Sequence, residues 1–232
     1  MRCGAGRNPG SSVVGKSDAM RTIVYIDGFN LYYGLLRGTP WMWLDLAALS
    51  KFLLTDKYVI NEIKYFTARI RSDRFSTVSP HDQSCYMDAL ASLPCLKIVE
   101  GYYRRFRAKL PFAREPCMSC DKAEYATVWK TEEKKSDVNL AVEMVSDAYE
   151  NKADAVVLIS GDADHSAALS VVRYRHRKTT VVFNPHPGEC AELRRLSTFY
   201  KNIPRDLPAK CQLPEVVTLP NGRTIHRPPA WA

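Results

Sequence analysis

Acidic side chains follow two apolar segments of this chain, at the point where each segment ends. Asp27 comes directly after the run 22–26, and Asp162 and Asp164 follow the run 154–159 after a Ser-Gly turn. Nearly unbroken apolar runs are typical of strands that are covered on both faces of a parallel sheet. Because the carboxyl ends of parallel strands meet at one edge, where ligands bind, we expect these carboxylates to lie close together.

A predicted helix places a fourth carboxylate at the same edge of the sheet. The stretch 136–149 carries apolar residues at helical spacing, and either Ser136 or Asp137 is a suitable N-cap for it. A crossover helix runs antiparallel to the strands that it connects, so its first turn lies at the carboxyl edge of the sheet. The sequence therefore predicts that Asp137 joins the other three acids.

Carboxylates gathered in this way repel one another and are costly without a cation. Oxygen ligands suit Mg²⁺ or Mn²⁺, and a water activated by such a metal can attack a phosphodiester. Each acid also has a structural alternative: Asp27 could belong only to a turn, and Asp137 and Asp164 could only cap helices. Asn30 could orient Asp27 or a water, or could cap the helix that begins near Leu31.

Three ordered motifs give the chain a resemblance to a known family. Residues 26–32 read Ile-Asp-Gly-Phe-Asn-Leu-Tyr, residues 133–138 read Glu-Lys-Lys-Ser-Asp-Val, and residues 160–164 read Ser-Gly-Asp-Ala-Asp. Over residues 21–203 the chain resembles the NYN domain, a branch of the PIN-like nuclease superfamily. The resemblance implies a three-layer α/β fold with a mainly parallel sheet and helices on both faces. It also implies a metal-dependent ribonuclease site in which Asp27, Asp137, Asp162 and Asp164 form the acidic cluster, with Asn30 beside it.

One residue departs from the family pattern. The residue after the last acid is usually aromatic in this family, whereas here it is His165. A histidine at this position could touch the scissile phosphate or the metal. We favour a packing substitution with a polar edge, because a lone histidine needs partners to be a convincing ligand.

Three functions from different classes are consistent with these features. The first is hydrolysis of single-stranded RNA with Mg²⁺ or Mn²⁺. The second is an NADH-dependent monooxygenase of the 6-hydroxy-3-succinoylpyridine 3-monooxygenase type, a name that some similar proteins carry. No Gly-x-Gly-x-x-Gly follows a strand-like run, so the sequence adds little to this second reading. The third is an RNA-binding module without catalysis.

A basic stretch and the overall charge favour a polyanionic partner. The formal net charge is +8, and residues 102–114 interleave aromatic residues with five cations. Such a stretch could grip phosphates and stack on unpaired bases, or it could be an ordinary solvated hairpin. The predicted nucleic-acid contacts are Arg104, Arg105, Arg107, Lys109 and Arg114.

The remaining organisation is simple. Residues 1–20 resemble a disordered leader without the apolar centre of a signal peptide, and no run reaches membrane-spanning length, so we expect a cytoplasmic location. Residues 204–232 carry six prolines and are expected either to pack on the domain or to mediate association, such as a homodimer. Cys117 and Cys120 have the spacing of half a zinc site, although reduced thiols on a loop are the preferred interpretation. Further strands are expected at 63–70, 96–103, 126–130 and 180–183.

Overall fold

The computed structural model describes residues 19–70, 79–112 and 125–231 and contains a central parallel sheet of six strands. The order of the strands is β3-β2-β1-β6-β7-β8, and every neighbouring pair is parallel. Their bounds are Met20–Asp27 for β1, Tyr58–Thr67 for β2, Leu96–Glu100 for β3, Ala155–Ile159 for β6, Thr179–Asn184 for β7 and Phe199–Asn202 for β8. The predicted α/β class with a mainly parallel sheet is confirmed.

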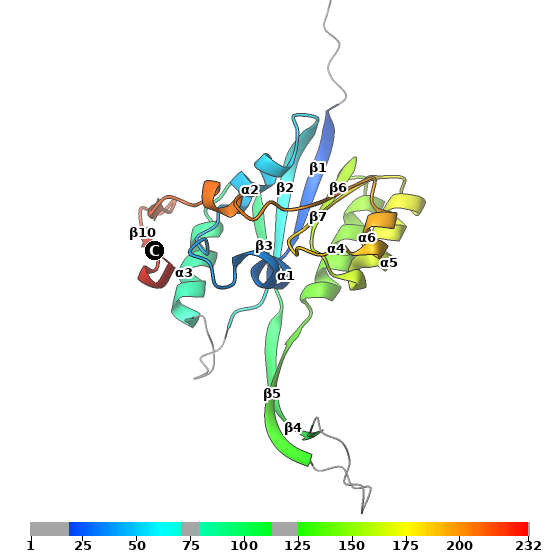
Figure 1. Cartoon of the computed structure of the whole chain (residues 1–232). Helices are drawn as coiled ribbons and strands as arrows, with labels where there is room; N and C mark the ends of the chain where they lie inside the picture. The colour runs from blue at the N-terminus through cyan, green and yellow to red at the C-terminus, as the bar shows by residue number, and fades with distance from the viewer. Residues whose placement is uncertain (1–18, 71–78, 113–124, 232) are drawn as a thin grey trace, which may run out of the picture.

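Helices cover both faces of this sheet, as Figure 1 shows. One face is covered by α1, η1, α2 and α3, with bounds Gly28–Leu31, Tyr32–Leu36, Leu46–Leu53 and Pro80–Leu90. The other face is covered by α4, α5, η3 and α6, with bounds Ser136–Tyr149, Ser166–Ser170, Val171–Arg175 and Ala191–Leu196. Successive residues of β1 divide between the two layers, because Val24 and Ile26 pack into one core and Ile23 and Tyr25 into the other. The three-layer arrangement is therefore built into the alternation of each central strand.

The strand order places a topological switch between β1 and β6. The chain builds outward from β1 to β2 and β3 and then crosses to β6, β7 and β8 on the other side. Crevices at such switch points, beyond the carboxyl ends of the strands, are where open α/β sheets bind ligands. Asp27 ends β1, and Ser160 follows β6 directly.

One predicted strand and the end of another lie outside the central sheet. The expected strand 96–103 is divided at Gly101 into β3 and β4 (Tyr102–Pro111), and the expected strand 126–130 lies within β5 (Tyr125–Lys134). β4 and β5 pair with each other in a separate antiparallel hairpin, which projects away from the body of the molecule in Figure 1. Residues 113–124, which include Arg114, Cys117 and Cys120, lie outside the described residues.

The segment after residue 203 packs on the domain. Leu207, Cys211, Leu213, Ile225 and Trp231 all belong to the core cluster on the α2 and α3 side of the sheet. Its regular elements are η4 (Pro208–Lys210), β9 (Val216–Thr218), β10 (Thr224–His226) and η5 (Pro229–Trp231). Among the described residues no helix combines the length and the apolar character needed to cross a membrane. Residues 1–18 of the expected leader lie outside the description, and β1 begins at Met20.

Candidate metal centre

Asp27 is held in place by hydrogen bonds at the carboxyl end of β1. Its Oδ1 accepts a hydrogen bond from the backbone N–H of Asn30 at 3.0 Å and thereby caps α1. Its Oδ2 accepts a hydrogen bond from the Ser160 hydroxyl at 3.0 Å, across the switch between β1 and β6. The residue is only 4% exposed. These two hydrogen bonds, from groups that follow β1 and β6, hold the carboxylate of Asp27 at the edge of the sheet.

Asp137 lies in the first turn of α4, and its own helix does not use its carboxylate. The N-cap is Lys135, whose φ of +83° places it in the left-handed region. The Glu133 carboxylate does the capping instead, accepting hydrogen bonds from the Ser136 backbone N–H at 3.1 Å and from the Ser136 hydroxyl at 2.7 Å. The prediction that Ser136 or Asp137 is the N-cap is therefore wrong. Because Glu133 takes this role, the side chain of Asp137 is available to the site.

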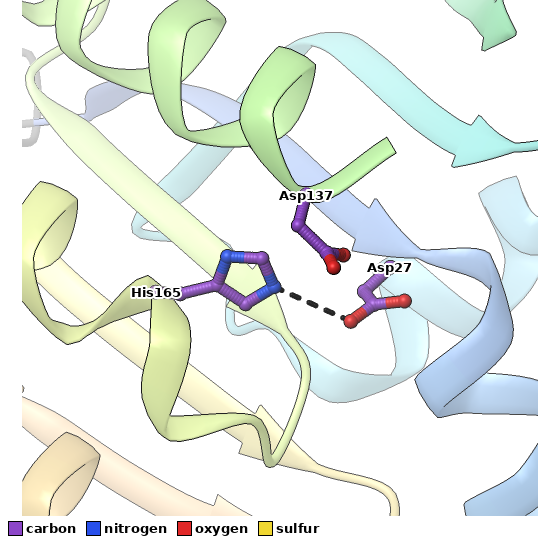
Figure 2. Close-up of side chains that lie close together, drawn as sticks. All are labelled: Asp27, Asp137 and His165. Atoms are coloured by element: carbon purple, nitrogen blue, oxygen red, sulfur yellow. Dashed lines mark hydrogen bonds and ion pairs between the residues drawn. The ribbon is translucent and has the colours of Figure 1, made fainter. Parts of the chain in front are cut away.

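His165 completes a compact group with these two acids. The ligand atoms of Asp27, Asp137 and His165 all lie within 4.8 Å of one another. Figure 2 shows the imidazole edge directed at the two carboxylates, with Nε2 at 3.3 Å from Oδ2 of Asp27. His165 is 1% exposed, whereas Asp137 is exposed at the rim. The ring is buried as a packing residue would be, and its polar edge places Nε2 beside the carboxylates of Asp27 and Asp137.

The electrostatics of the group follow from this crowding. Although Asp137 is exposed as a residue, partial burial of its carboxylate raises its pKa above the ordinary value, and the negative charge of Asp27 raises that pKa further, whereas His165 opposes the shift. Burial lowers the pKa of His165, but the hydrogen bond to Asp27 and the charges of Asp137 and Asp162 outweigh burial and raise it above 6.5. The site therefore concentrates negative charge that only His165 offsets within this group.

The remaining predicted site residues have different places. Asp162 accepts a hydrogen bond from the backbone N–H of Asp164 at 3.0 Å and caps η2 (Ala163–His165), close enough for its charge to act on Asp137 and His165. Asp164 is exposed, and neither Asp162 nor Asp164 belongs to the compact group. Asn30 accepts a hydrogen bond from the Gly161 N–H at 2.7 Å through its Oδ1, so it ties the β6 turn to α1.

The side chain of Asn184 leaves no room for a Cβ at position 161. A Cβ at position 161 would lie 2.3 Å from Oδ1 of Asn184, which is far below any ordinary contact. The backbone of the Ser-Gly turn therefore lies close against the side chain of Asn184, the last residue of β7. This approach presents Ser160 to Asp27 and starts η2, which carries His165.

The basic residues of β4 stand apart from the acidic group. Arg104, Arg105, Arg107 and Lys109 are exposed along the projecting hairpin, and Arg114 lies outside the described residues. The root of the hairpin contacts the site region, because the rings of Tyr103 and Phe29 meet edge to face with centroids 5.8 Å apart.

The fold is that of a PIN-like α/β protein, with acidic residues at the carboxyl edge of its parallel sheet. The NYN domain family matches residues 21–201, and this chain belongs to that family. The chain is 32% identical over 240 residues to 6-hydroxy-3-succinoylpyridine 3-monooxygenase HspA of Pseudomonas putida (strain DSM 28022 / S16), with 93% of this chain and 76% of HspA covered.

A solved structure shares the fold. It is a protein of unknown function, VPA0982, from Vibrio parahaemolyticus RIMD 2210633, with a TM-score of 0.52 and 15% sequence identity. The match covers 86% of this chain and 100% of that one. At this identity the likeness concerns the fold alone.

Proposed function

We propose that this protein is a metal-dependent ribonuclease that cuts single-stranded RNA at the carboxyl edge of its sheet. The observation that carries the proposal is the meeting of Asp27, Asp137 and His165 at the switch point between β1 and β6. The NYN domain supports a nuclease-like activity, and the net charge of +8 suits a polyanionic substrate.

The residues of this group fit a divalent cation. Among the described residues no group donates a hydrogen bond to the carboxylate of Asp137, although this carboxylate faces that of Asp27. A cation would relieve that repulsion, with Asp27, Asp137 and His165 as its ligands and Asp162 near enough to contribute charge. Two carboxylates with one imidazole suit Mn²⁺ better than Mg²⁺, because imidazole favours transition metals. When bound, such a cation would supply Lewis-acid stabilisation of phosphate charge and a water of lowered pKa.

The protein's own groups prepare the site for this chemistry. Ser160 and the Asn30 backbone N–H fix both oxygens of Asp27, and Asn30 fixes the turn that carries His165. Such fixed orientation reduces the reorganisation that a reaction needs. Asp164, exposed beyond the turn, is left with the proposed role of assisting the metal or the attacking water.

Substitution of Asp137 tests the proposal most cleanly. The Asp137→Asn variant should fold normally, because its carboxylate accepts no hydrogen bond from the part of the chain that the structure describes, and it should lose about 100-fold or more in RNA cleavage with Mn²⁺. Asp56→Asn is the matched control, because Asp56 is exposed in the turn before β2, at the opposite edge of the sheet. Cleavage of a labelled unstructured RNA by highly purified protein measures both. Equal cleavage by the parent and Asp137→Asn would overturn the assignment.

The likeness to HspA favours a second candidate function. Under this alternative the protein is a monooxygenase that acts on a substituted pyridine and takes electrons from NADH. Its test is consumption of NADH that depends on 6-hydroxy-3-succinoylpyridine, in a preparation free of other oxidoreductases. Consumption without any RNA cleavage would select the monooxygenase, and RNA binding without either activity would select a non-catalytic RNA-binding module.

A further inference from the structure

The two faces of the β4–β5 hairpin differ in chemistry. The strands pair antiparallel from Tyr102 opposite Lys134 to Pro111 opposite Tyr125. Residues directly opposite each other share a face, and the faces alternate along each strand. Arg105, Arg107 and Lys109 therefore lie on the same face as Trp129, which is opposite Arg107, and Tyr125. We name these five residues the cationic face.

The cationic face combines charge with exposed rings. The guanidinium groups of Arg105 and Arg107 lie 4.9 and 5.2 Å from the ring centroid of Trp129, and the ammonium of Lys109 lies 5.2 Å from that of Tyr125. Trp129 is 58% exposed. These contacts keep the cations and the rings together on one surface, with both accessible from outside.

The opposite face of the hairpin is partly neutralised. It carries Arg104, Lys130 and Lys134, but the Glu132 carboxylate lies between the two lysines at 2.6 and 2.8 Å. Arg104 therefore points away from the cationic face, although the sequence grouped it with Arg105 and Arg107 as a nucleic-acid contact. The difference between the faces provides a control within one hairpin.

The cationic face begins beside the acidic site. At its root Tyr103 and Glu133 are opposite each other, Tyr103 contacts Phe29, and Glu133 caps the helix that carries Asp137. The Gly101 N–H donates to the carbonyl of Thr67 at 2.8 Å, which fixes the root to the carboxyl end of β2. At about 3.4 Å per residue, Arg107 and its partner Trp129 lie about 14 Å along the hairpin from Tyr103.

We propose that the cationic face is a binding track for the part of a single-stranded RNA that extends out of the acidic site. The three cations would contact phosphates and Trp129 would stack on an unpaired base, since grooves for single strands combine these two features. A second copy of the chain fits less well, because each copy carries a net charge of +8 and would present the same cations. That the bound RNA is also the substrate of the acidic site rests on the proposed function.

Binding and cleavage are measured separately to test the track. In EDTA, the anisotropy of a labelled RNA of about 12 nucleotides should show affinity about tenfold weaker for Trp129→Ala and for Arg107→Ala. Arg107→Ala should also lower the salt slope of binding by about 0.7, which corresponds to one phosphate contact. Arg104→Ala is the matched control for charge, and its affinity should stay close to that of the parent. Equal weakening by Arg104→Ala and Arg107→Ala would overturn the proposal, because binding would then follow net charge alone.

Tryptophan fluorescence gives a local readout. Of the other three tryptophans, Trp43 and Trp231 are 0% and 6% exposed and Trp41 is partly buried against the core, whereas Trp129 is 58% exposed. The larger part of any quenching on RNA addition should therefore come from Trp129, and that part should be lost in Trp129→Phe. The phenylalanine variant should recover part of the affinity that Trp129→Ala loses, because it keeps a stacking ring. Persistence of the full quenching in Trp129→Phe would overturn the assignment of the stacking ring.

Substrate length distinguishes failure of the track from failure of the proposed function. A dinucleotide in the acidic site is too short to reach Trp129, so Trp129→Ala should slow cleavage of the longer RNA but not of the dinucleotide. If Trp129→Ala and Arg107→Ala cleave RNAs of both lengths as the parent does, the binding track is refuted and the proposed ribonuclease function stands. If the parent binds RNA through the cationic face but does not cleave it, the proposed ribonuclease function is refuted and the binding track stands. Self-association that Arg107→Ala abolishes, without RNA binding, would show the face to be an interface between copies.

Discussion

At the scale of single residues, His165 influences the site through its position beside Asp27. The imidazole is buried and its Nε2 lies 3.3 Å from Oδ2 of Asp27, so it can either bind a cation or orient the carboxylate that does. We predict that His165→Phe, which restores the aromatic residue usual in the family, keeps the fold but weakens Mn²⁺ binding by about tenfold or more. Titration of Mn²⁺ by calorimetry measures this change.

The choice between the two roles of His165 depends on a comparison of metals. If the imidazole is a ligand, His165→Phe should weaken the binding of Mn²⁺ more than the binding of Mg²⁺, because Mg²⁺ depends less on nitrogen ligands. If the imidazole only orients Asp27, the substitution should weaken the binding of both metals by the same factor. Unchanged affinity for both metals would show that His165 belongs to packing alone.

The sequence predicted the acidic edge in outline but could not assign its members. Asp27 and Asp137 meet as expected, since strand ends and first helical turns meet at the carboxyl edge of a parallel sheet. The position of the carboxylates beyond β6 depends on the turn: Asp162 is used as a cap for η2, and this short helix brings His165 into the group instead of Asp164. A tight turn of this kind follows from close contacts with Asn30 and Asn184, which no local pattern reveals.

At the scale of elements, a buried ion pair joins β2 to α4. The ammonium of Lys64, on β2, is only 3% exposed at its side chain and contacts the carboxylates of Asp147 and Glu143 on α4. The Tyr25 hydroxyl donates a hydrogen bond to Asp147 at 2.7 Å. This network fixes the helix that carries Asp137 to the sheet that carries Asp27.

Removal of one partner of this network should be costly. We predict that Asp147→Asn lowers the free energy of unfolding by about 3 kcal/mol near neutral pH, because it leaves a buried ammonium with less compensation. Urea unfolding measures this loss. Asp154→Asn is the matched control: its pair with Arg21 is nearly half exposed on both sides, so solvent screening should keep its effect small. Equal losses for the two variants would contradict the prediction.

The same carboxylate gives a predicted dependence on pH. Burial raises the pKa of Asp147, but hydrogen bonds from Lys64, Tyr25 and Lys152 outweigh burial and lower it below its ordinary value of 3.8. Because the pKa of Asp147 is lower in the folded state than in the unfolded state, the network stabilises the protein fully at pH values above 3.8. This stabilisation is lost as the pH falls toward the folded pKa. The difference in stability between the parent and Asp147→Asn should therefore shrink from about pH 5 downward. A difference that stays constant down to about pH 3 would contradict this sign.

The hairpin shows which elements a sequence predicts poorly. β1 and β6 were predictable, because residues buried on both faces form unbroken apolar runs. β4 and β5 are mostly exposed, and only part of β4 alternates exposed and partly buried residues, a pattern that an ordinary sheet strand shares. Whether such a strand joins the central sheet depends on contacts at its root, including those of Gly101, and these appear only in the structure.

At the scale of the whole molecule, the proline-rich C-terminal segment is part of the core. Trp231 is 6% exposed and lies against Trp43 and Tyr86, with ring centroids 6.3 and 5.7 Å apart. The Trp43 indole N–H donates to the carbonyl of Pro214 at 2.8 Å, so the same segment satisfies the polar atom of a fully buried ring. Composition indicated an extended segment, but its partners lie more than a hundred residues away and could not be predicted.

This arrangement predicts that two tryptophans control separate properties of the protein. Trp231→Ala should lower the free energy of unfolding by about 3–5 kcal/mol, because it leaves a cavity among Trp43 and Tyr86. Trp129→Ala removes the same side chain from an exposed surface, so it should weaken RNA binding while leaving stability close to that of the parent. Chemical unfolding and RNA anisotropy on both variants measure the separation. A large loss of stability in Trp129→Ala would mean that the hairpin contributes to the core, and an unaffected Trp231→Ala would mean that the C-terminal segment does not. The expected outcome separates folding, which needs the C-terminal segment, from RNA binding, which needs the hairpin.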